Sequence, residues 1–200
     1  MSLDLVVFDY SEVLSRNQPQ PVVRALEEAA GVPPKAFWEA WHRHRPAYNT
    51  TASADEYWRL VADDLGAGWD AAHRQRLWSL DIGNCLNPHE PTVRVLRRLH
   101  GRVPLALLSD APRDLARCLD GSPVMALFDR RFFSCDTGVN KPDPLAYETV
   151  LLRTGARPER TLFVDDNRNN TRGAERLGLQ AHHYTTAEGL GHHLSAVYGL

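Results

Sequence analysis

Residues 5–14 read LVVFDYSEVL, an apolar run that ends in a carboxylate and a short polar turn. The run is β-branched and aromatic without alternation, which predicts a strand covered on both faces, as in a parallel sheet. Ligands of such sheets gather at the carboxyl ends of the strands, and Asp9 stands at that end. We therefore place the chemistry at Asp9, although an Asp in this position can also simply cap a turn.

Composition narrows the class of protein. With 200 residues and 43% hydrophobic side chains, the chain can bury one sizeable core and still carry a modest insertion. A net charge of -2 with mixed signs predicts no binding to nucleic acid or membrane surfaces, and leaves a small molecule as the expected partner. Cys85, Cys118 and Cys135 are far apart, which argues against a disulfide framework or a zinc site. The absence of a basic leader or of an apolar run near the ~18 residues of a membrane span predicts a cytoplasmic, unexported protein.

Residues 15–91 have the residue pattern of helices. Pro19 and Pro21 open a first amphipathic segment that Gly31 ends, and aromatic residues at helical spacing follow from Phe37 to Tyr48. Ser53 and Asp70 are expected N-caps of two more helices, and residues 87–91 have the composition of a linker. We predict an inserted bundle of about four helices, whose aromatic residues mostly form its core.

From Thr92 strands and helices alternate. Thr92–Leu99 is an amphipathic helix, and Asp110 is expected to N-cap the helix that follows Ser109. The expected strands are 103–109, 131–135, 161–165 and 179–184, with helices after Lys141, Asn167 and Ala187. This alternation predicts an α/β fold, a Rossmann-like doubly wound parallel sheet formed by residues 1–14 and 92–200.

The polar residues that follow these strands should converge on one edge of the sheet. Asp9, Asp165 and Asp166 cannot lie close together without a cation, and an oxygen-only set of ligands suits Mg²⁺ better than zinc or iron. Ser109 and Lys141 would then face an anion. A carboxylate nucleophile, a hard cation, a hydroxyl and a lysine together describe a phosphoryl-transfer site. No GxxxxGK[ST] loop is present, so a P-loop nucleotide enzyme is not expected.

Four segments in this order resemble the motifs of the haloacid-dehalogenase-like (HAD) hydrolases. They are Val7–Leu14, Leu107–Ser109, Lys141–Pro144 and Phe163–Asn167, the last followed by Gly173 and Gly178. The helical insertion after the first motif resembles the cap of subfamily I, and the small sugar-phosphate phosphatases are the nearest group. The resemblance implies that Asp9 attacks phosphorus, that Ser109 and Lys141 hold the phosphoryl oxygens, and that Asp165 and Asp166 serve Mg²⁺. The expected partner is a small phosphorylated metabolite.

Two positions depart from the family pattern. Phosphatases of this family usually carry a second Asp two residues after the nucleophile as the general acid and base, and here that position is Ser11. The family binds magnesium there through the main-chain carbonyl, which Ser11 still supplies. Asp110 stands where relatives often have Asn, beside the expected phosphate pocket, and the N-cap role would point it away.

Two other functions are compatible with the sequence. The dehalogenase branch also lacks the second Asp, attacks carbon and needs no metal, but Asp165 and Asp166 argue against it. A binding protein that kept the fold without catalysis is the other alternative.

Three further sets of residues are weaker candidates for a functional role. Glu12 is a conceivable substitute acid, and Arg45 or His44 a conceivable reader of a substrate anion, although residues 42–45 look like a solvated helix face. The pairs His182–His183 and His192–His193 lack metal-site spacing and are interpreted as surface residues.

Overall fold

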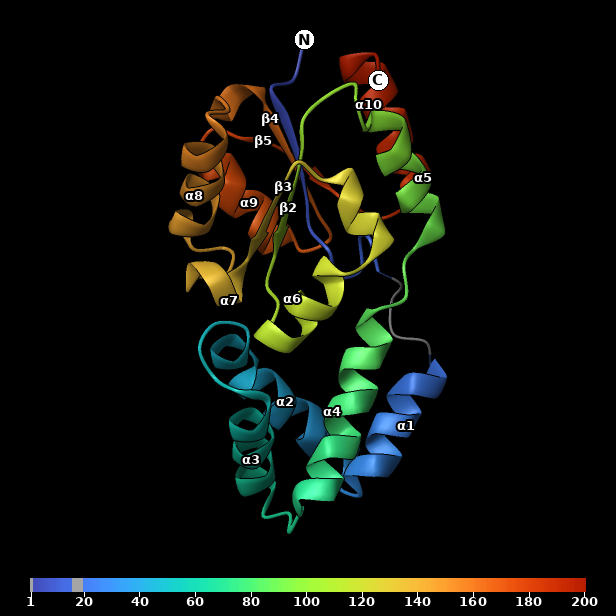
Figure 1. The fold of residues 1–200 in the computed structure, drawn as a ribbon, viewed down its shortest axis with the longest axis vertical. Coiled ribbons are helices and arrows are strands. Elements are labelled where there is room, and N and C mark those ends of the chain that lie inside the picture. The colour runs from blue at the N-terminus through green and yellow to red at the C-terminus, as the bar shows by residue number, and fades with distance from the viewer. Residues whose placement is uncertain (1, 16–19) are drawn as a thin grey trace.

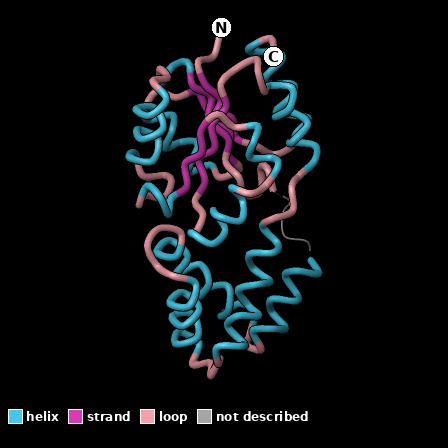
Figure 2. Tube along the Cα trace, viewed as in Figure 1, coloured by secondary structure: helices cyan, strands magenta, loops and turns pink. Residues whose placement is uncertain are grey.

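A computed structural model describes residues 2–15 and 20–200 of the chain. Its centre is a parallel sheet of five strands in the order β3-β2-β1-β4-β5 (Figures 1 and 2), so the predicted doubly wound fold is confirmed. The strands are β1 (Leu5–Phe8), β2 (Leu105–Ser109), β3 (Arg130–Phe133), β4 (Thr161–Asp165) and β5 (Gln180–His183).

Helices cover both faces of the sheet because each strand sends alternate side chains to opposite sides. Val6 and Phe8 belong to the core under α5 (Glu90–Leu99), α6 (Arg113–Asp120) and α10 (Ala187–Tyr198). Leu5 and Val7 belong to the core under α8 (Pro144–Thr154) and α9 (Arg168–Arg176). Three short helical segments complete the sheet domain: η1 (Pro123–Leu127), α7 (Ser134–Thr137) and η2 (Pro158–Arg160).

The register of the three central strands brings their carboxyl ends to one level. Phe8 pairs with Leu107 on one side and with Val164 on the other. Asp9 and Asp165 come directly after the paired residues and Ser109 comes two residues after Leu107, so all three lie at or next to the strand ends. The convergence expected from the sequence follows from this register.

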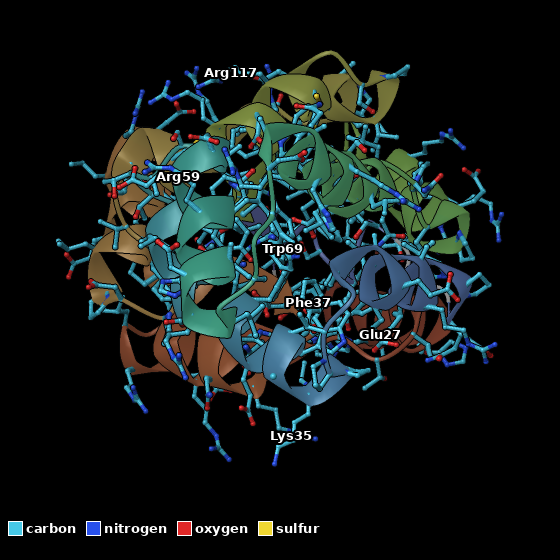
Figure 3. The ribbon with its side chains drawn as sticks, turned by 90° about the horizontal axis from the view of Figure 1, so that it is seen from below. Glu27, Lys35, Phe37, Arg59, Trp69 and Arg117 are labelled. Carbon is cyan, nitrogen blue, oxygen red and sulfur yellow. The ribbon has the colours of Figure 1, made fainter. Side chains whose placement is uncertain are left out.

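A four-helix unit is formed by α1 (Gln20–Ala30), α2 (Pro34–Tyr48), α3 (Ala54–Leu65) and α4 (Ala71–Cys85). Ser53 and Asp70 cap α3 and α4 through their side chains as predicted. Pro19, one of the two prolines expected before the first helix, lies outside the described residues. The unit has its own apolar core, with Phe37, Tyr48, Tyr57, Trp58 and Trp69 buried. Figure 3 shows Phe37 and Trp69 inside the unit, whereas Lys35 projects outward.

The four-helix unit lies beyond the carboxyl edge of the sheet (Figure 1). The chain leaves the sheet domain and returns to it at neighbouring points, because Ser15 and Pro88 form an isolated bridge and the His89 N–H donates to the Leu14 carbonyl oxygen over 2.7 Å. The linker that we expected over residues 87–91 is shorter than predicted, because residues 87–89 connect α4 to α5 and α5 begins at Glu90 rather than at Thr92.

None of the helices in the described ranges combines the length and apolar character needed to cross a membrane.

Candidate active site

Lys141 joins two carboxylates at the carboxyl edge of the sheet. Its Nζ lies 2.6 Å from Asp9 Oδ1 and 2.9 Å from Asp165 Oδ2, and its side chain is 1% exposed. Burial alone would lower the pKa of Lys141, but the charges of Asp9, Asp165 and Asp110 outweigh it and raise that pKa. The lysine is therefore held in its charged form.

Asp165 is saturated by hydrogen bonds within the protein. Its Oδ1 accepts from the Asn167 N–H at 2.7 Å, its Oδ2 accepts from Lys141, and the Asn170 side-chain amide lies 3.1–3.2 Å from both oxygens. The side chain is fully buried. Asp165 is therefore suited to hold Lys141 in place, and Asn170 is a contributor that we did not predict from the sequence.

Asp166 is the carboxylate of this site that is still able to bind a further group. It is half-buried, and burial, followed by the charges of Asp165 and Glu12, raises its pKa to about 6. Carboxylate oxygens of Asp9, Asp165 and Asp166 lie within 4.8 Å of one another, and this is the one such group of three ligand residues among the described residues. Burial, and after it the Asp165 charge, also raises the pKa of Asp9, against the effect of Lys141.

The donor set fits a hard divalent cation. Lys141 forms ion pairs with Asp9 and Asp165 but not with Asp166, so an added positive charge between Asp9 and Asp166 would favour the ionised form of both. Ser11, whose carbonyl we expected to take part, lies exposed in the turn that follows Asp9. The ligands are oxygens only, which is the set that Mg²⁺ prefers.

Ser109 ends β2, and Asp110 follows it. Ser109 is 1% exposed, and its hydroxyl makes no hydrogen bond to any residue in the described ranges. The prediction that Asp110 caps the next helix is wrong, because Pro112 is the N-cap of α6 and Asp110 Oδ1 accepts from the Lys141 N–H at 3.0 Å. Asp110 thus fixes the backbone of the loop that carries Lys141. Burial raises the pKa of Asp110.

Glu12 adopts a left-handed backbone conformation, with φ of 58°, in the turn after Asp9. Its N–H donates to Ser15 Oγ at 3.1 Å, which holds the turn closed. The Glu12 side chain is exposed, yet its charge contributes to the raised pKa of Asp166.

The end of α2 contacts α6 and the loop that carries Lys141. The Tyr48 hydroxyl donates to Asp114 Oδ2 at 2.6 Å, and the Trp78 indole donates to the same oxygen. Asn140, next to Lys141, donates its side-chain amide to the Pro46 carbonyl at 2.8 Å. We did not predict this set of contacts from the sequence.

A second link joins α2 to the loop after β2. The Ser134 hydroxyl donates to the Asn49 carbonyl oxygen at 2.6 Å and accepts from the Ala111 N–H at 2.9 Å. The first amide after Asp110 is therefore already used within the protein.

Arg45 is an exception to the interpretation of residues 42–45 as a solvated face, in which His42 and Arg43 are exposed as expected. Its guanidinium lies 2.6 Å from Asp81 Oδ2, with 14% of the Arg45 side chain and none of the Asp81 side chain exposed. The guanidinium also lies 4.4 Å from the centroid of the Trp41 ring. His44 instead pairs with Asp64 at 2.8 Å on the outer face of the unit, so it does not reach toward Asp9.

The paired histidines do not form a metal site in the described residues. The rings of His182 and His193 lie 4.6 Å apart, and His193 Nε2 is buried without a hydrogen-bond partner among the described residues. Burial, followed by the charge of His193, lowers the pKa of His182 to about 4. His182 and His193 are therefore not simple surface residues. The contact between their rings adds no support for a metal site.

Gly173 allows α9 to pass close to the loop that carries Lys141 and Pro142. A Cβ built there would lie 2.9 Å from Tyr147 Oη and 3.0 Å from Pro142 Cβ. We expect Gly173→Ala to lower the free energy of unfolding by about 1–3 kcal/mol, because neither neighbour can move freely in a packed core. Urea denaturation measures this loss. Gly83→Ala is the matched control, since nothing lies within 4 Å of that site in α4; an equal loss in both variants would contradict the packing argument.

The sequence matches the family described as haloacid dehalogenase-like hydrolases over residues 3–178. Among curated proteins, it is 32% identical over 103 residues to the sesquiterpene phosphatase astK of Aspergillus oryzae. The matched segment covers 50% of this chain and 53% of that protein. The chain is 31% identical over 97 residues to (S)-2-haloacid dehalogenase 2 of a Pseudomonas species, covering 48% and 42%. The chain spans about half the length of these curated relatives or less.

Solved structures share the fold. A HAD family enzyme of Bacteroides thetaiotaomicron in a magnesium complex superposes with a TM-score of 0.78 at 16% identity, covering 97% of this chain and 99% of that one. The L-2-haloacid dehalogenase of Xanthobacter autotrophicus, with chloropropionic acid covalently bound, superposes with a TM-score of 0.72 at 21% identity, covering 98% and 84%. These structural likenesses concern the fold alone, and they include a magnesium-bound enzyme as well as a dehalogenase.

Proposed function

Because the chain belongs to the haloacid dehalogenase-like hydrolases, we propose that it is a Mg²⁺-dependent phosphatase of a small phosphorylated metabolite, acting through an aspartyl-phosphate at Asp9. The observation that carries this proposal is the group of Asp9, Asp165 and Asp166, whose oxygens lie within 4.8 Å of one another and of which Lys141 pairs with two, Asp9 and Asp165. Such a group needs a further cation, and a cation beside a carboxylate nucleophile suits attack on a phosphoryl group.

In this proposal each residue has a separate role. Asp9 attacks phosphorus, the bond from phosphorus to the leaving oxygen breaks, and water later cleaves the acyl phosphate and restores Asp9. Lys141 and the free hydroxyl of Ser109 bind the phosphoryl oxygens, while Asp165 keeps Lys141 charged and in position. Asp9, Asp166 and the Ser11 carbonyl would hold Mg²⁺, which when bound offsets the negative charge of the substrate.

We further propose that residues 15–91 act as a cap over the site, with residues 1–14 and 92–200 as the catalytic domain. The support is the position of the four-helix unit beyond the carboxyl edge of the sheet and its contacts with Asp114 and Asn140. A unit in that position bounds the space in which the organic part of a substrate lies.

Ser11 is the observation that favours the second candidate, a metal-independent 2-haloacid dehalogenase. Asp166 argues against it, because a half-buried carboxylate with a raised pKa gains nothing from a mechanism without a cation. Turnover of p-nitrophenyl phosphate and of 2-chloropropionate, each with Mg²⁺ and with EDTA, separates the two. Magnesium-dependent release of p-nitrophenol supports the phosphatase; chloride release in EDTA supports the dehalogenase; no turnover of either favours the binding protein.

Ser11 also predicts how the rate depends on the leaving group. With no acid at this position, p-nitrophenyl phosphate should be hydrolysed far faster than an alkyl phosphate of similar size, because an aryl oxide leaves without a proton. Ser11→Asp should therefore accelerate hydrolysis of the alkyl phosphate by up to ~10²-fold and change the aryl rate much less. The kcat/KM values of both substrates measure this.

Glu12→Gln is the control for that experiment. If Ser11→Asp gains nothing on alkyl phosphates while Glu12→Gln makes the leaving-group dependence steeper, Glu12 already supplies the proton and the argument from Ser11 fails. An unchanged dependence in both variants would mean either that a residue of the four-helix unit supplies the proton or that phosphate monoesters are the wrong substrate class.

A further inference from the structure

Strand β3 forms an open edge of the sheet, away from the site around Asp9. It pairs with β2 on one side, and none of the described segments pairs with its other side. The Asp129 N–H donates to the Leu105 carbonyl at 2.9 Å, toward β2. Because successive residues of a strand direct their backbone groups to opposite sides, those of Arg130 and Phe132 face outward. An edge of this kind can accept an additional strand.

Two cavities follow this edge, and together we call them the edge groove. They have volumes of about 470 Å³ and about 230 Å³, and Asp129, Arg130 and Arg153 line both. The larger one extends toward Asp120 and Asp136, and the smaller one toward the amino ends of β1 and β2. The larger cavity therefore runs along β3, and the smaller one continues below the amino ends of β2 and β1.

The carboxylates of the edge groove already have partners. Asp120 accepts from Arg117 at 2.9 Å and from Arg131 at 3.1 Å, and Asp136 also pairs with Arg117, which Figure 3 labels. Asp129 accepts the Leu105 N–H at 2.8 Å. These acids therefore have little capacity left for a bound cation.

Two arginines of the groove are uncompensated. The side chains of Arg130 and Arg153 make no hydrogen bond or ion pair with any residue that the structure describes. Arg153 lies over the ring of Phe132, with its Cζ 5.9 Å from the centroid. Phe132 packs in the core under α8, and Arg130, two residues earlier, faces the same side. Both positive charges thus border the face of the edge that α8 covers.

A second copy of this chain is a poor occupant of the edge. Pairing of β3 with itself would bring Arg130 and Arg131 of both copies together, and like charges on adjacent strands are destabilising. The same charges are complementary to an acidic strand.

We propose that the edge groove binds an extended acidic segment of a partner protein, which adds to the sheet as a strand beside β3. Backbone hydrogen bonds to Arg130 and Phe132 would supply the register. Acidic side chains at alternate positions of the segment would face Arg130 and Arg153, because alternate residues of a strand lie on one face. The residues between them would face the neutralised pairs of Asp120 and Asp136.

A short synthetic peptide in which Glu and Val alternate tests this inference, and fluorescence anisotropy measures its binding. We expect binding that weakens with added salt, because the charges are exposed. A peptide with Gln in place of Glu should bind about tenfold more weakly or worse. Hydrogen exchange should slow at the amides of Arg130 and Phe132 when the Glu peptide is bound, which an attraction to side chains alone would not cause.

Charge reversal gives the decisive comparison. The double variant Arg130→Glu/Arg153→Glu should lose about tenfold or more in affinity for the Glu peptide and should gain affinity for a peptide in which Lys and Val alternate. Arg24→Glu, an exposed arginine of α1 without an ion pair among the described residues, is the matched control and should bind as the parent does. Thermal melting verifies the fold, and Arg153→Gln replaces the double variant if it does not fold.

Four results would overturn the inference. They are absence of binding, binding without slowed exchange at β3, binding that charge reversal leaves unchanged, and a dimer of the free protein that the double variant abolishes in sedimentation.

Discussion

Asp9→Asn should reduce turnover of p-nitrophenyl phosphate by about 10⁴-fold or more, because an amide keeps the shape of the side chain but cannot attack phosphorus. The fold should survive the change. Asp9 is 6% exposed and shares Lys141 with Asp165, so removal of one negative charge relieves repulsion among the carboxylates. Steady-state rates of the purified variant and its thermal melting curve measure both expectations.

The control for this variant changes a neighbouring carboxylate in the same way. Asp110→Asn can keep the bond to the Lys141 N–H through its amide oxygen, and it removes a negative charge beside the expected phosphate. We expect turnover to persist with a lower KM. Turnover in Asp9→Asn comparable to that of the parent would refute the assignment of the nucleophile, whatever the control does.

Removal of the metal should have the second large effect. EDTA should abolish phosphatase turnover, and excess Mg²⁺ should restore it, because Asp9 and Asp166 need a cation to be ionised together. Asp166→Asn should raise the Mg²⁺ concentration for half-maximal rate by at least about tenfold. Calorimetric titration with Mg²⁺ gives the same comparison without turnover.

Asp165→Asn is the matched variant for the metal site. The sequence predicts that both acids serve the metal, but three donor groups occupy Asp165. We therefore expect Asp165→Asn to lower kcat through Lys141 while changing Mg²⁺ affinity less than Asp166→Asn does. A full rate in EDTA would transfer the assignment to the dehalogenase chemistry.

The residues at the strand ends could be predicted because parallel strands end at a common edge. Asp9, Ser109 and Asp165 each follow or end an apolar run, and the pairing of Phe8 with Leu107 and Val164 brings them together. Helix positions could be predicted where a local cap exists, as at Ser53 and Asp70. These features depend on short stretches of chain.

Contacts between separate elements could not be predicted in this way. Asp110 looked like a helix cap because a cap is the nearest use for an Asp before a helix, whereas its partner lies 31 residues away. The Arg45–Asp81 and Tyr48–Asp114 pairs span 36 and 66 residues and depend on how α2 lies against α4 and α6. The spacing of residues within one helix does not determine how that helix is oriented against its neighbours.

The adjacent crossings at Ser15 and Pro88 have a consequence for how such a protein can diversify. Since the chain departs and returns through neighbouring points, a short loop from Leu14 to His89 would close the sheet domain without disturbing its strands. An unrelated helical module with similarly spaced ends could be grafted at the same junction. Under the proposed function, recombination there would exchange the surroundings of the substrate in one step and leave the proposed nucleophile, Asp9, unchanged.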